Sequence, residues 1–80
     1  MKWQGSQLEF AELTKALIQS NLINPELPEK ERFARMKQFF NVADFSQSDK
    51  LKDIRKRSRD LTPLINTLET ALTNWINSKD

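Results

Sequence analysis

Apolar residues recur at intervals of three and four along much of the chain, which is the spacing of an amphipathic helix. The strongest such pattern follows Thr62-Pro63, a capping residue before a proline that suits the first turn of a helix. The spacing therefore predicts a helix that begins there and places Trp75 in the core. The apolar stripe consists of Leu61, Leu64, Ile65, Leu68, Leu72, Trp75 and Ile76.

A second pattern predicts a helix from about Gln7 to Leu22. Ser6 and Glu9 have the spacing of a capping box, in which each residue hydrogen-bonds the backbone amide of the other. Asn24-Pro25 is expected to end this helix, because proline disfavours the helical conformation of the residue before it. Glu12 is expected to be a solvated side chain. The apolar stripe consists of Phe10, Leu13, Ala16 and Leu17.

A third helix is predicted to begin at Pro28, which is tolerated in a first turn, and to end near Asn41. Glu29 and Glu31 lie near the positive, N-terminal end of its dipole and Lys37 near the negative, C-terminal end. All three charges therefore interact favourably with the dipole and stabilise the helix. The large apolar face consists of Phe33, Met36, Phe39 and Phe40, which we expect in the core or in an interface.

The remaining helix has few apolar residues. It is predicted to begin after a cap at Ser46, or at Asp44 if the boundary is earlier, and to run to about Ser58. Leu51 and Ile54 are its only certain apolar positions, and Phe45 just before it is expected to anchor it in the core.

These patterns predict an all-α fold, with four helices around one core. The one strand candidate, Lys2–Gln4, allows at most a very short N-terminal strand. Trp3 within it has two possible places, against the last helix or against a neighbouring domain. Eighty residues make a single domain, so residues 1–80 are expected to fold as one unit.

Composition argues against catalysis and metal binding. The chain has no cysteine and no histidine, which removes thiolate ligands, the commonest metal ligand and the commonest general base. We therefore expect no enzyme, no metal, no cofactor and no small-molecule substrate. Apolar runs are far shorter than the roughly 20 residues that cross a bilayer, and the first residues lack an apolar signal core. The sequence thus predicts a cytoplasmic protein without membrane contact.

Positive charge is concentrated in residues 50–59. This segment contains six basic residues and one acidic residue, Asp53, so its net charge is +5. Since the net charge of the whole chain is +2, the remaining residues sum to −3. On a helix, four of them recur at spacings of three and four and share one face, an arrangement suited to phosphate contacts. We therefore predict contacts to the phosphates of a nucleic acid, by four residues first, then by Arg57 and Lys50. The four are Lys52, Arg55, Lys56 and Arg59.

Two other interpretations stay open. A basic run on a small protein is often only a solvated face, and an Asp53–Arg57 pair four residues apart would merely support the helix. Alternatively, the wide apolar stripe of the last helix would suit a protein-interaction or dimerisation module that binds no nucleic acid. Salt-dependent binding of nucleic acid distinguishes the nucleic-acid-binding interpretation from both.

Several short motifs resemble the C-terminal domain of RteC proteins, over nearly the whole chain. The start Trp3-Gln4-Gly5-Ser6, then Glu12-Leu13, Ala16-Leu17, Ser20 and Ile23-Asn24, is similar to the opening of that domain. Phe39-Phe40-Asn41-Val42 resembles its aromatic-rich helix end, and Ile54-Arg55-Lys56-Arg57 resembles its Ile-Arg-x-Arg segment. Thr62, Leu68 and Leu72 also match.

The resemblance implies a transcriptional regulator associated with excision of conjugative transposons, with a winged-helix-like DNA-binding domain. It implies that the predicted helices over about 28–41 and 46–58 form a helix-turn-helix, the latter as recognition element. Leu61 and Ser58 depart from the family, which commonly has Arg and often Lys there. No hairpin signal precedes Thr62, so the sequence does not predict a conventional wing. The chain is expected to be either a C-terminal module or a stand-alone relative.

Overall fold

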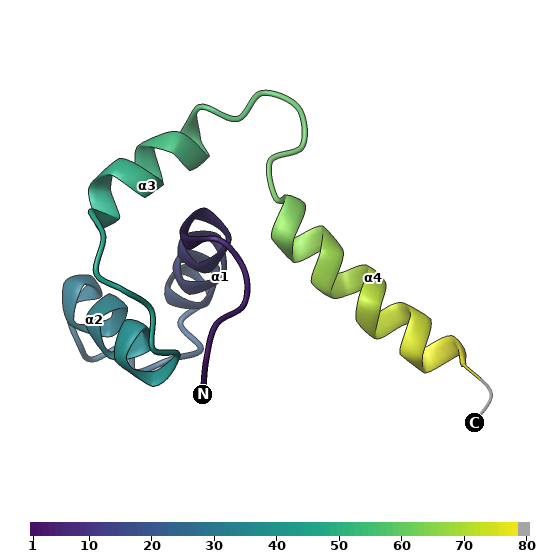
Figure 1. The fold of residues 1–80 in the computed structure, drawn as a ribbon, viewed down its shortest axis with the longest axis horizontal. Helices are drawn as coiled ribbons and strands as arrows, with labels where there is room; N and C mark the ends of the chain where they lie inside the picture. Colours follow the sequence, from purple (N-terminus) through teal and green to yellow (C-terminus); the bar gives the residue numbers. More distant parts are fainter. Residues whose placement is uncertain (79–80) are drawn as a thin grey trace.

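The computed structural model describes residues 1–78 and places three helices around the first one (Figure 1). No strand is present in these residues, so the prediction of an all-α fold with four helices is confirmed. The first helix, α1, contacts each of the other three. The bounds are α1 Gln7–Gln19, α2 Glu29–Phe39, α3 Gln47–Arg55 and α4 Pro63–Asn77.

Two helices, α1 and α3, begin directly after a serine whose side chain caps them. The Ser6 hydroxyl accepts the Glu9 amide at 3.0 Å and the Glu9 carboxylate accepts the Ser6 amide at 2.7 Å, which confirms the capping box. Ser46, rather than Asp44, caps α3 by accepting the Asp49 amide. A side chain at Gly5 would meet the Glu9 carboxylate at 2.9 Å, so only glycine fits beside this cap without a shift.

Two helices end in the same way, each with an asparagine in the left-handed region. Asn21 after α1 has φ 58° and Asn41 after α2 has φ 54°. In both, the asparagine amide and the next amide bond back to carbonyls of the last turn, for example Val42 to Lys37 at 2.9 Å. This is the Schellman arrangement. The expected end of α1 at Leu22 was therefore too late, because Asn21 ends the helix before Asn24-Pro25 is reached.

The core forms around the buried Phe10. Its ring meets the rings of Trp3, Phe40 and Phe45 edge to face, with centroids 5.6 to 6.2 Å apart. Trp3 thus packs on α1 and on the end of α2. The buried stripe of α1 is rotated from the predicted one, since Ala16 is exposed. The buried apolar residues are Phe10, Ala11, Ile18, Phe33 and Leu64, with Ile23, Phe45, Leu51 and Ile54 partly buried around them.

Glu12 joins α1 to the start of α4. It is 5% exposed, so the expectation of a solvated side chain is wrong. One of its carboxylate oxygens accepts the Arg57 guanidinium at 2.6 Å, and the other accepts the Ile65 amide at 2.9 Å. The second contact caps α4 from another helix. The Thr62 side chain, the predicted cap, makes no capping bond and donates instead to Asn66.

Beyond its first turn, α4 leaves the body of the molecule (Figure 1). Leu64 is its only buried residue in the described range, whereas Trp75, expected in the core, is 71% exposed. The radius of gyration is 13.9 Å, against about 12 Å for a globular domain of this length. The solvent-accessible area is 6146 Å². A compact monomer of this mass usually exposes about 5,000 Å², so the excess is roughly 1,100 Å².

The left-handed conformation of Asn41 gives a first prediction. We expect Asn41→Ala to lower the free energy of unfolding by about 1 kcal/mol, because a Cβ without a local polar partner is strained at positive φ. Asn41→Gly should keep or slightly raise it. Urea unfolding monitored by circular dichroism measures both, and equal losses in the two variants would contradict the prediction.

The buried carboxylate gives a second prediction. We expect Glu12→Gln to lower the free energy of unfolding by about 3 kcal/mol, since it leaves the Arg57 guanidinium without its charge partner. The matched control is Glu9→Gln on the same helix, where an amide still serves the capping box and the loss should stay below about 1 kcal/mol. Chemical unfolding of the two variants under one condition makes the comparison, and losses of similar size would refute the role given to Glu12.

Candidate nucleic-acid interface

The basic segment, residues 50–59, lies partly on α3 and partly on the link to α4. The helix ends at Arg55 with Lys56 as its C-cap, so it is shorter than the predicted span to Ser58. Arg59 therefore lies beyond the helix, and the single helical face expected for four basic residues is limited to α3 and its cap. Lys52 and Arg55 occupy the last turn, where positive charge also favours the helix dipole.

Four residues of the basic segment point into solvent. Lys52, Arg55, Lys56 and Arg59 are exposed, and Lys50 is half-buried. Within residues 1–78 none of these five side chains forms an ion pair or a side-chain hydrogen bond. On the opposite side of α3, Leu51 and Ile54 pack against the core. The helix is thus fixed by its apolar side while its cations stay available to a ligand.

Arg57 has a different place. Its side chain is 15% exposed and its guanidinium binds the Glu12 carboxylate at 2.6 Å and the Leu61 carbonyl at 2.9 Å. The expected pair with Asp53 is not formed. Arg57 therefore holds the link between α3 and α4 against α1, and its charge is already compensated within the fold.

The connection from α2 to α3 also differs from the helix-turn-helix motif that the resemblance implied. It spans residues 40–46, longer than the turn of about three or four residues that usually joins the two helices of that motif. Both helices pack on α1, and Gln47 at the start of α3 donates to Glu29 at the start of α2 at 3.1 Å. No hairpin follows α3 in the described residues, so there is no wing of the usual kind.

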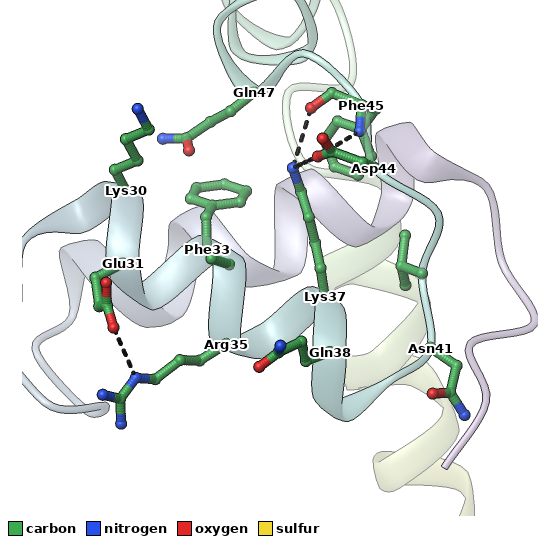
Figure 2. A pocket seen from close by; sticks show the side chains of 12 residues that line it. Lys30, Glu31, Phe33, Arg35, Lys37, Gln38, Asn41, Asp44, Phe45 and Gln47 are labelled. Atoms are coloured by element: carbon green, nitrogen blue, oxygen red, sulfur yellow. Dashed lines mark hydrogen bonds and ion pairs between the residues drawn. The ribbon is translucent and has the colours of Figure 1, made fainter.

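A shallow pocket lies beside α2 and includes no residue of the basic segment (Figure 2). Lys37 crosses it to reach the Asp44 carboxylate at 2.9 Å and the Phe45 carbonyl at 3.0 Å, with its ammonium 4.2 Å from the centre of the Phe45 ring. These contacts fix the loop before α3. Residues 1–78 contain no group of three or more carboxylate, histidine or cysteine side chains that could hold a metal ion.

The Lys37 ammonium holds the pKa of the Asp44 carboxyl below its usual value of 3.8, through its hydrogen bond first and its charge second. The Phe45 amide adds a smaller effect in the same direction. Since both contacts favour the ionised form, they stabilise the loop only while Asp44 is charged.

Comparison with known proteins decides the family. The whole chain, residues 1–80, matches the family model described as RteC protein. The chain belongs to the RteC family. The resemblance to RteC proteins is thereby confirmed at the level of the family.

Other comparisons add nothing further about this RteC chain. Neither a curated protein nor a solved structure matches it significantly. RteC is a regulatory family, so membership indicates a role related to regulation. In the part of the chain that the structure describes, no helix has the length and apolar content needed to cross a membrane.

The lowered pKa of Asp44 gives a third prediction. We expect Asp44→Asn to be less stable than the wild type at neutral pH, and this difference to disappear as the pH falls through the folded-state pKa of Asp44, below 3.8. The sign follows because a carboxyl whose pKa is lower in the folded than in the unfolded state stabilises the fold while it is ionised. This contribution is lost as the pH falls through the folded-state pKa. Unfolding of both proteins from neutral pH to about pH 2 tests it. Asp53→Asn is the matched control, since the Asp53 carboxylate has no basic partner in residues 1–78. A stability difference between Asp44→Asn and the wild type that persists in acid would contradict the prediction.

Proposed function

We propose that this chain is the DNA-binding domain of an RteC-type regulator, and that its basic segment contacts the phosphates of double-stranded DNA. The observation that supports this most strongly is the exposure of Lys52, Arg55, Lys56 and Arg59 without acidic partners among residues 1–78. The rest of the chain has a net negative charge and could have supplied acidic partners, yet none of these four cations is neutralised. Action on DNA would place the domain in the cytoplasm.

The arrangement suits backbone contact better than base reading. The exposed cations sit at the C-terminal end of α3 and on the link after it, spread over residues 52–59. Contacts from lysine and arginine to phosphates position a protein on the duplex and supply affinity, but they carry no sequence information. Arg57 contributes by holding the link to Glu12, which reduces the conformational freedom that Arg59 and Lys56 would lose on binding.

An interaction module that binds no nucleic acid is the second candidate. It is favoured by the apolar face of α4, on which Leu72 is 58% and Trp75 is 71% exposed. The two functions use different surfaces, since α4 carries none of the basic residues discussed above.

The proposal predicts binding that weakens steeply with salt. If the four exposed cations each neutralise one phosphate, the logarithm of the association constant should fall against the logarithm of salt concentration with a slope of about −3 to −4. Fluorescence anisotropy with a labelled duplex of arbitrary sequence, titrated at several salt concentrations, measures this slope. Absence of binding at low salt would refute the proposal.

Substitutions locate the contact. K52Q/K56Q should reduce the magnitude of the slope by about 2, since two phosphate contacts are lost. The matched control is K2Q/K30Q, which removes the same charge from exposed lysines outside the basic segment. If both double variants weaken binding equally, only the overall charge matters and the assignment to residues 52–59 is wrong.

A further inference from the structure

Beyond the first turn of α4, its large apolar residues form one stripe that has no partner in the described chain. Leu68, Leu72, Trp75 and Ile76 are 44, 58, 71 and 62% exposed. Isolated apolar residues on a surface are ordinary, but a continuous stripe along a helix marks a surface that another structure covers. The excess of exposed area, roughly 1,100 Å², is of the size that one partner contributes to a standard protein interface, about 800 Å².

Charge limits the kind of partner. Glu69 is the single charged residue among the fifteen of α4, and its polar face otherwise consists of threonine and asparagine. A helix that lies on a membrane usually has lysine and arginine on its polar face, and α4 has neither. A strongly charged partner would likewise find no complementary charge. An uncharged helical surface of the same character as α4 fits best.

The positions in the stripe have a symmetry that identifies such a surface. Leu68 and Leu72 lie equally far on either side of residue 70, as do Ile65 and Trp75, and Leu64 and Ile76. When two identical helices pack antiparallel about a two-fold axis at residue 70, each position meets the one equally distant on the other side. Leu68 then faces Leu72, and Trp75 faces the half-buried Ile65, while Leu64 stays in the core of its own chain. A two-fold interface requires such self-complementarity.

We propose that α4 binds α4 of a second copy of this chain, antiparallel, with Leu68 of each chain opposite Leu72 of the other. The contact covers Trp75 of each copy with Ile65 of the partner's α4. It involves neither the basic segment nor Glu12, so it stands whether or not the chain binds DNA.

Sedimentation velocity over a range of protein concentrations tests the association. We expect the mass of one chain at low concentration and of two chains at high concentration. Leu72→Glu should abolish the increase, because it places two carboxylates in the apolar contact. Thr73→Glu, which adds the same charge on the threonine- and asparagine-bearing side of α4, should leave it unchanged. Circular dichroism should show equal helix content, since residues 72 and 73 are exposed in the single chain.

Cross-linking tests the orientation. The chain has no cysteine, so introduced thiols give unambiguous products. A mixture of L68C and L72C chains should form the mixed disulfide several-fold faster than either variant forms its own. Faster pairing of like with like would show parallel helices and overturn the proposal. A single-chain mass at all concentrations, a mass above two chains, or equal loss in Leu72→Glu and Thr73→Glu would also overturn it.

Discussion

The pairing of the buried Glu12 carboxylate is the interaction on which the arrangement of this domain depends. A carboxylate taken out of water is costly unless its charge is balanced and its oxygens are hydrogen-bonded. Here one oxygen meets the Arg57 guanidinium and the other meets the Ile65 amide at the positive end of α4. Three parts of the chain thereby share one anion: the central helix, the link that carries the basic residues, and the start of the last helix. Leu64 is the single buried apolar residue of α4 that adds to this junction.

Much of the local structure could be predicted from the sequence, because it depends on residues a few positions apart. The capping box at Ser6, the cap at Ser46 and the proline at the start of α4 all act within one helical turn, and each was predicted at its place. The contacts that were missed lie far apart in the chain. Glu12 bonds partners 45 and 53 positions away, and neither periodicity nor capping rules report on such distances. The early end of α1 is an exception, since asparagine after a helix is itself a local signal.

The candidate interface was predictable as a concentration of charge but not as a surface. Composition could not distinguish Lys52, which is exposed and unpaired in the described residues, from Arg57, whose charge is used inside the fold. The stripe of α4 has the same ambiguity. Periodicity indicates that a helix has an apolar face, but it does not indicate which molecule covers that face, and Trp75 was assigned to the core of its own chain for this reason.

The attachment of α4 at one end has a mechanical consequence. The helix has fifteen residues and is about 22 Å long, while its anchors, Glu12 and Leu64, act only on the first turn. A tilt of about 10° at the anchored first turn would therefore displace the far end of α4 by about 4 Å, as for a rigid rod of this length. Because Arg57 shares the same carboxylate, a movement of the link would be transmitted to α4 and enlarged along it.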